Sequence, residues 1–259
     1  MTVTTEIADG IATVTLNRPE KKNAWNLEMF TALQDACAGL TGVRAVILTG
    51  SGGAFSSGLD LSVMMSFGGK LDDLRAQLAK VDESGANFFQ RPVTCWASLG
   101  VPVIAAIEGV CLGAGMQLAL GADFRIASPD ARMSIMEAKW GLIPDMGITQ
   151  SLPKLLRADQ AKMLMLTARM MSGEEASELG LVTELSADPL ARARTLAAEL
   201  ASKSPDAQRD AKRLVEEAWD GGRQALKLEA ELQAALMGSP NQMEAVMSNM
   251  QKRPAKFGS

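Results

Sequence analysis

The chain has 259 residues, of which 47% are hydrophobic, and its formal net charge is −4. This hydrophobic share is ample for a folded core and argues against general disorder, and the acidic balance argues against a nucleic-acid-binding protein, which usually presents a basic surface. The sequence contains no histidine. It therefore excludes Ser-His-Asp and Cys-His catalytic groups and histidine-based metal sites, and leaves acid–base chemistry to Asp, Glu, Lys, Cys or water.

The cysteines and the apolar segments indicate the cellular compartment of the protein. Cys37, Cys95 and Cys111 form neither a CxxC motif nor an even-numbered set, which predicts a reduced, cytoplasmic setting. The first residues show neither the basic segment nor the apolar core of a signal peptide. The apolar run 101–107 is interrupted by Pro102 and is too short to span a membrane. We expect partners that are neither nucleic acids nor membranes.

The first 190 residues alternate between strand and helix patterns. Residues 3–7 and 11–16 flank Asp9-Gly10, which is typical of a hairpin turn. Asn26 is a candidate N-cap for a helix that runs to about Leu40. The buried stripe of this helix is expected to include Leu27, Phe30, Leu33 and Leu40. Further strands are expected at 43–49, 101–107, 123–127, 132–135 and 181–185, and further helices at 71–90, 149–156, 159–167 and 173–179.

From about residue 190 the strand pattern stops and only helical patterns follow. Helices are expected at 190–202, 205–219, 223–237 and 242–251. We therefore predict an α/β fold with two parts, a strand-and-helix core over 1–190 and a helical C-terminal region over 191–259. The apolar positions of that region could cover the core or pack on another subunit.

The stretch from Gly109 to Asp145 combines a glycine-rich turn with two acids. The turn, residues 109–115, leads into the apolar start of a helix. Backbone without bulky side chains can present N–H groups to a developing negative charge. A carboxyl group in apolar surroundings, such as that of Glu137, can exchange a proton near neutral pH. The stretch therefore predicts proton chemistry beside a polarised carbonyl group.

Four motifs occur in a characteristic order: residues 17–24 (NRPEKKNA), 55–61 (FSSGLDL), 102–115 (PVIAAIEGVCLGAG) and 141–147 (GLIPDMG). Together they resemble the motifs of the crotonase superfamily, also called the enoyl-CoA hydratase/isomerase family, over essentially the whole chain. The resemblance implies a crotonase-like ββα spiral core with a helical C-terminal trimerisation region, as a homotrimer or a dimer of trimers. It also implies an acyl-CoA substrate, so that coenzyme A enters as part of the substrate and no separate cofactor or metal is expected.

The resemblance also implies roles for individual residues. The backbone N–H groups of Ser57 and Ala114 would form the oxyanion hole that holds the thioester oxygen. Glu137 occupies the position of the family's catalytic glutamate. Asp145, eight residues later, stands where members that shift conjugated dienes carry an acid, although it could instead cap the helix that follows.

The resemblance also implies that a second group of residues contacts the substrate. Arg18, Lys21 and Lys22 form a basic cluster suited to the phosphates of coenzyme A. The residues implied to contact coenzyme A or the acyl group are Lys22, Ala24, Ser56, Leu59, Asp60 and Gln117.

Gln117 departs from the pattern of the hydratases, which carry a second glutamate at this position. Two acids hold and activate the water that hydratases add, whereas an amide does not exchange a proton. The sequence therefore predicts an enzyme that shifts a double bond, an enoyl- or dienoyl-CoA isomerase. Two alternatives remain: an enoyl-CoA hydratase in which Asp145 or Gln117 holds the water, and a non-catalytic acyl-CoA-binding protein.

Overall fold

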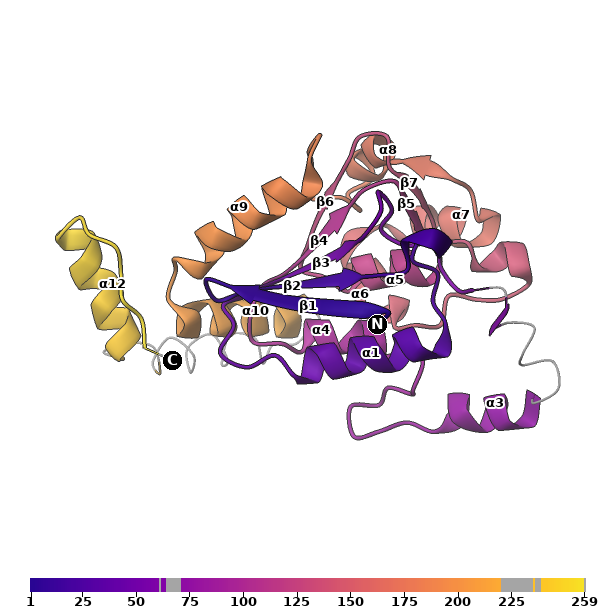
Figure 1. Ribbon diagram of the computed structural model, residues 1–259, viewed down its shortest axis with the longest axis horizontal. Helices are drawn as coiled ribbons and strands as arrows, with labels where there is room; N and C mark the ends of the chain where they lie inside the picture. The colour runs from indigo at the N-terminus through magenta and orange to yellow at the C-terminus, as the bar shows by residue number, and fades with distance from the viewer. Residues whose placement is uncertain (61, 64–70, 220–234, 236–238, 259) are drawn as a thin grey trace.

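A six-stranded sheet lies at the centre of the computed structural model, which describes residues 1–60, 62, 63, 71–219, 235 and 239–258 (Figure 1). The strands follow the order β1-β2-β3-β4-β6-β9, with β1 and β2 antiparallel and each later pair parallel. Their bounds are β1 Val3–Ala8, β2 Ile11–Leu16, β3 Ala45–Gly50, β4 Val103–Ile107, β6 Phe124–Ala127 and β9 Glu184–Leu185.

The predicted N-terminal hairpin is confirmed. Asp9 and Gly10 both have positive φ, at 51° and 75°, as the two central residues of a tight hairpin turn require. Val3 pairs with Leu16 at the far end of the hairpin. The turn chemistry read from the sequence therefore agrees with the strand register that the structure shows.

Side chains of the two central strands alternate between the two faces of the sheet. Val46 and Leu48 of β3 face the larger core with α1 (Leu27–Ala38) and α4 (Arg91–Ala97), whereas Ala45 and Ile47 face α9 (Pro189–Ala201). Figure 1 shows α9 on the opposite side of the sheet from α1 and α4. Because Ala193 and Ala197 of α9 are buried in this contact, the first helix after the strands packs on the sheet itself.

Helix α1 begins where the sequence predicts. The Asn26 side chain accepts a hydrogen bond from the Met29 N–H at 3.0 Å, so the N-cap is confirmed. Phe30 and Leu33 are buried as expected, but Leu27 is exposed, so its assignment to the buried stripe is wrong. Leu27 is the first helical residue, and its neighbour Glu28 is exposed as well.

The predicted helix over 71–90 is wrong in its second half. Helix α3 covers only Leu71–Ala79, and a β-bridge between Val81 and Asn87 follows. The Asn87 side chain accepts the N–H groups of Phe89 and Gln90, and this local bonding competes with a continuous helix. Pro92 lies in the first turn of α4, where its missing N–H costs nothing.

A second, three-stranded sheet brings distant segments together beside the first. It contains β5 Val110–Leu112, β7 Arg132–Ser134 and β8 Met171–Ser172. Ser56 forms an isolated parallel bridge to Cys111 of β5, with the Ser56 N–H donating to the Val110 carbonyl and the Leu112 N–H donating to the Ser56 carbonyl, each at 2.9 Å. The motif at 55–61 therefore lies alongside the glycine-rich turn.

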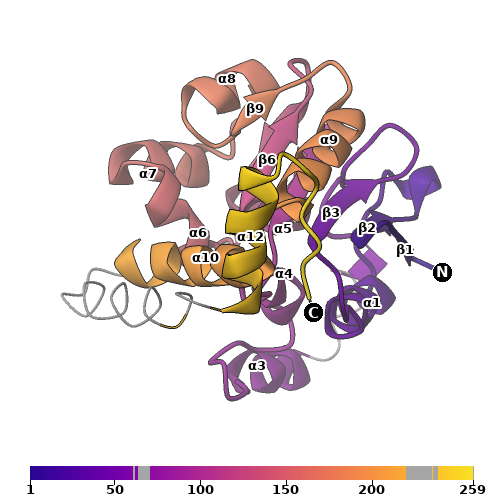
Figure 2. The same ribbon diagram turned by 90° about the vertical axis from the view of Figure 1, so that its left-hand side faces the viewer.

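The remaining helices lie outside these sheets (Figures 1 and 2). Figure 1 shows α12 at the end of the molecule opposite α7. The predicted helix 223–237 lies almost wholly outside the described residues. Within the described part of the chain, no helix combines the length and the apolar character needed to cross a membrane. The bounds are α5 Ala114–Leu120, α6 Ile148–Leu155, α7 Ala158–Thr167, α8 Gly173–Glu178, α10 Pro205–Trp219 and α12 Pro240–Met250, with short 3₁₀ helices η1 Pro19–Lys21 and η3 Glu137–Trp140.

Candidate active site

The glycine-rich turn ends in helix α5, whose first N–H group is available. Gly113, the N-cap, has φ 50° and ψ −118°, a conformation open to glycine, and its N–H donates to the Ser134 carbonyl at 3.0 Å. Ala114 is the first helical residue, so its N–H has no acceptor within the helix. Among the described residues it has no backbone acceptor elsewhere either. Ala114 therefore remains the predicted donor of this segment.

The N–H of Ser57, predicted as the other oxyanion donor, is already used. It donates to the Lys22 carbonyl at 2.8 Å, which contradicts its availability for a ligand oxygen. Two residues later, the Leu59 N–H has no acceptor among the described residues, while Asp60 N–H donates to the Trp25 carbonyl at 3.0 Å. The sequence marked the right motif but could not tell which of its N–H groups a distant carbonyl would occupy.

Gly58 allows the two segments to approach. It has φ 89°, and a Cβ at this position would lie 2.8 Å from the Leu112 carbonyl oxygen and 3.7 Å from the Ala114 nitrogen. Only a residue without a side chain fits here. Because Leu59 follows Gly58 directly, the unpaired N–H groups of Leu59 and Ala114 belong to adjoining pieces of backbone.

Replacing Gly58 with alanine is therefore expected to be costly. We expect Gly58→Ala to lower the free energy of unfolding by about 2–4 kcal/mol, because backbone strain adds to the clash with Leu112. Gly53 is a matched control, since it also has positive φ (71°) but a Cβ added there would have no atom within 4 Å. Gly53→Ala should cost only about 1–2 kcal/mol. Urea denaturation of both variants measures this difference, and equal losses would contradict the close approach.

The Glu137 carboxyl group lies beside the same glycine-rich turn. Its Oε1 accepts a hydrogen bond from Gln117 Nε2 at 2.7 Å and would lie 3.5 Å from a Cβ placed on Gly113. Its Oε2 is buried and has no hydrogen-bond partner. Burial is the largest influence on this group and raises its pKa, and the negative charge of Asp145 raises the pKa further. The hydrogen bond from Gln117 and the adjoining backbone of Met136 and Glu137 oppose the rise.

Gln117 has both ends of its amide occupied. The side chain is only 1% exposed, and its Oε1 accepts the Met146 N–H at 2.8 Å while its Nε2 donates to Glu137. The prediction of Gln117 as a residue that contacts the substrate therefore has no exposed polar atom to support it. The structure shows it instead as a bridge between Glu137 and the segment before α6.

Asp145 does not cap a helix. The N-cap of α6 is Gly147, and the helix start has no side-chain cap, so the N-cap interpretation of Asp145 is wrong. Asp145 is exposed, but neighbouring protein atoms remove enough water from its carboxyl group to raise its pKa. Its influence on the Glu137 pKa shows that the two acids share one region. The catalytic role of Asp145 stays a prediction.

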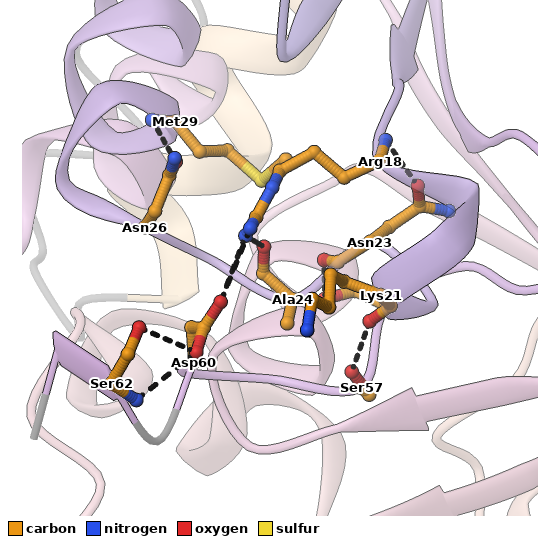
Figure 3. Close-up of polar contacts among 10 residues, drawn as sticks. Arg18, Lys21, Asn23, Ala24, Asn26, Met29, Ser57, Asp60 and Ser62 are labelled. Carbon is orange, nitrogen blue, oxygen red and sulfur yellow. Dashed lines mark hydrogen bonds and ion pairs between the residues drawn. The ribbon is translucent and has the colours of Figure 1, made fainter.

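Two of the predicted coenzyme A contacts, Ala24 and Asp60, instead hold a loop together. The Arg18 guanidinium donates to the Ala24 carbonyl at 2.5 Å and to Asp60 Oδ2 at 3.2 Å (Figure 3). Asp60 also accepts the N–H and O–H of Ser62, and these hydrogen bonds, with the ion pair to Arg18, lower its pKa. Arg18 therefore joins the loop around Ala24 to the segment that carries Leu59, and its assignment to a phosphate-binding cluster is not supported.

Ser56 is another predicted contact that the structure contradicts. It is fully buried, its O–H donates to the Asn23 carbonyl at 2.8 Å, and its oxygen accepts the Gly58 N–H at 3.1 Å. Lys22, in contrast, is exposed, and no described residue forms an ion pair with it or with Lys21. Of the predicted basic cluster, these two lysines remain available for phosphates.

Comparison with known proteins agrees with this arrangement. Residues 6–259 match the family model described as enoyl-CoA hydratase/isomerase. The chain belongs to this family. Among curated relatives of this enoyl-CoA hydratase/isomerase family member, the probable enoyl-CoA hydratase echA6 of Mycobacterium tuberculosis is 33% identical over 258 residues, which cover 96% of each chain. The peroxisomal Delta(3,5)-Delta(2,4)-dienoyl-CoA isomerase of Arabidopsis thaliana is also 33% identical, over 93% of this chain and 90% of the relative.

Solved structures share the fold. A putative enoyl-CoA hydratase from Streptomyces coelicolor A3(2) superposes with a TM-score of 0.89 and 34% identity, covering all of this chain and 94% of that one. An enoyl-CoA hydratase from Bacillus anthracis also reaches 0.89, at 28% identity over 99% of both chains. The predicted family and its crotonase-like α/β fold are thereby confirmed.

Proposed function

We propose that this family member moves a carbon–carbon double bond within the acyl group of a coenzyme A thioester. The observation that carries the proposal is that the buried carboxyl of Glu137 is paired with the amide of Gln117 and not with a second acid. Hydration needs groups that hold a water molecule and take its proton. An amide does not take a proton near neutral pH, and the Gln117 oxygen is already used by Met146.

In the proposed reaction the N–H groups of Leu59 and Ala114 bind the thioester oxygen and stabilise the negative charge that develops there. Glu137 Oε2 takes a proton from C2 of a 3-enoyl thioester, and the electrons of that C–H bond form the C2=C3 bond. The former C3=C4 electrons then take a proton at C4 from the same carboxyl group. The product is the 2-enoyl thioester, and Glu137 ends in the state in which it began.

Asp145 extends the same chemistry to a diene. In a 3,5-dienoyl thioester, loss of the proton at C2 and addition of a proton at C6 give the 2,4-diene. We propose that Glu137 takes the proton from C2 and that protonated Asp145 gives one to C6, because the charge of Asp145 acts on Glu137. The proton then held by Glu137 passes back to Asp145 before the next turnover. The similarity to a relative named as a dienoyl-CoA isomerase supports this extension.

Hydration of a 2-enoyl thioester is the second candidate. Most of the relatives above are named as hydratases, which favours it. In that case Asp145 would hold the attacking water together with Glu137. The two candidates share the oxyanion donors and differ in whether water is added.

The purified full chain should be incubated with 2-enoyl-, 3-enoyl- and 3,5-dienoyl-CoA of equal acyl length. The products should be separated by chromatography, which distinguishes isomers of equal mass, and then weighed by mass spectrometry. We expect the 3-enoyl or 3,5-dienoyl thioester to be converted to a conjugated product of unchanged mass. Rapid gain of one water by the 2-enoyl thioester, without isomerisation of the others, would overturn the proposal in favour of hydration. Binding of all three without turnover would instead establish an acyl-CoA-binding protein.

A further inference from the structure

Gln117 connects three pieces of the chain around the proposed catalytic acid. It lies on α5, and its side chain reaches Glu137 on η3 and Met146 before α6. We propose that Gln117 is a positioning residue that reserves Oε2 of Glu137 for proton transfer, and that the Met146 N–H sets its orientation. This inference rests on the proposed role of Glu137 and adds which of its two oxygens works and what holds it there.

The partners of the amide determine its orientation. A backbone N–H such as that of Met146 only donates, so the atom of Gln117 that faces it must be the oxygen. The NH₂ group then necessarily faces Glu137 at 2.7 Å. A rotated amide would place two donors together at Met146 and two acceptors together at Glu137, so only one orientation satisfies both ends.

This fixed donor makes the two oxygens of Glu137 unequal. A proton on Oε1 would compete with the N–H that Gln117 directs at the same atom, whereas Oε2 is buried and unpartnered. Desolvation without a partner favours the proton on Oε2. Oε2 is therefore the oxygen that accepts and returns the proton, and Oε1 is the anchored one.

The described elements around Glu137 carry few charged groups that could affect its titration. Helix α5 carries no charged side chain, and η3 carries Lys139, whose ammonium lies 5.5 Å from the centre of the Trp140 ring. Helix α7, which packs against η3, contributes the exposed Asp159 and Lys162. Asp145 is the charged neighbour whose negative charge raises the Glu137 pKa.

The test follows Glu137 directly, by ¹³C NMR titration of its labelled side-chain carboxyl in the free full-length protein. In Gln117→Met, which keeps the size but removes both hydrogen bonds, we expect the titration midpoint of Glu137 to move to higher pH, because the carboxylate loses its donor. In the isomerase assay, kcat should fall by a much larger factor than the factor by which KM changes. An unchanged midpoint in the folded variant would overturn the proposal.

Two further variants keep this test decisive. Gln117→Glu retains an acceptor for the Met146 N–H, so it serves if Gln117→Met does not fold. The two facing carboxyl groups should then share a proton and titrate in two coupled steps, and independent single-step titration would count against the proposal. Gln150→Met makes the same chemical change at an exposed site on α6 and should leave Glu137 unaffected. Because the titration needs no turnover, failure of the isomerase assay alone would overturn the proposed function and not this inference.

Discussion

Glu137→Gln is expected to lower kcat for the double-bond shift by about 10²- to 10⁴-fold, the range typical of a positioned acid–base group. Glutamine keeps the shape of the side chain, and its oxygen can still accept the hydrogen bond from Gln117. It cannot take the proton that Oε2 is proposed to carry. Steady-state kinetics with the best of the tested acyl-CoA esters measure the loss, and a similar KM would show that the substrate still binds.

Glu108→Gln is the matched control for this change. Glu108 is an exposed acid just before the glycine-rich turn, so its replacement removes the same charge outside the proposed proton path. It should leave kcat within about twofold, as is usual for surface substitutions. If Glu137→Gln lost no more activity than Glu108→Gln, Glu137 would not be the proton carrier.

The same carboxyl group should determine the acid limb of the pH profile. Glu137 must start unprotonated, so kcat/KM should fall as the pH drops through its pKa. Burial raises that pKa, so the midpoint should lie above the value of about 4.3 for an ordinary glutamate. The negative charge of Asp145 contributes to the rise, and Asp145→Asn should therefore shift the midpoint to lower pH. A midpoint that moved up in Asp145→Asn would contradict this placement of the two acids.

Ala114→Pro should lower kcat by about 10²- to 10³-fold, because it removes one of the two proposed oxyanion donors. Ala114 is the first residue of α5, where proline is well tolerated since that N–H has no helical partner. The preceding Gly113 can adopt backbone conformations that other residues cannot, which favours accommodation of the ring. The helix should therefore persist while the donor is lost, and circular dichroism checks the fold alongside the kinetics.

Ala114→Gly provides the comparison, because it changes the side chain and keeps the N–H. Its kcat should stay within a few-fold of the parent protein, although stability should fall by about 0.5–1 kcal/mol from the helix propensity of glycine. A large loss in Ala114→Pro with little loss in Ala114→Gly assigns the effect to the N–H. Similar activity in both variants would show that this N–H does not bind the thioester oxygen.

Local patterns predicted much of this structure because they depend on neighbouring residues. The Asp9-Gly10 turn and the Asn26 cap act within a few residues, and both are confirmed. The helix expected over 71–90 was wrong because Asn87 bonds the backbone around it, a competition that periodicity does not register. The sequence patterns did not predict strand β8, because it has only two residues and is defined by its pairing with β7.

In the candidate site, too, local patterns predicted some features and contacts between distant segments decided the others. Motif resemblance indicated the segments that carry the proposed donors, yet it selected Ser57, whose N–H is taken by the Lys22 carbonyl. It also assigned Ser56 and Asp60 to ligand contacts, although both serve the internal bonding of their loop. A carbonyl or a guanidinium group far away in the sequence decides these cases, and no local pattern encodes its arrival.

The sequence by itself determined the chemical inventory of this protein: a chain without histidine, with acids at 137 and 145 and an amide at position 117. Those identities set which groups can exchange a proton, because protonation chemistry belongs to the side chain. Only the tertiary structure decided which backbone N–H groups stay unpaired and which oxygen of Glu137 stays open. The physical reason is that each buried hydrogen-bonding group is satisfied by whatever partner the fold brings to it, and in this site those partners come from separate segments of the chain.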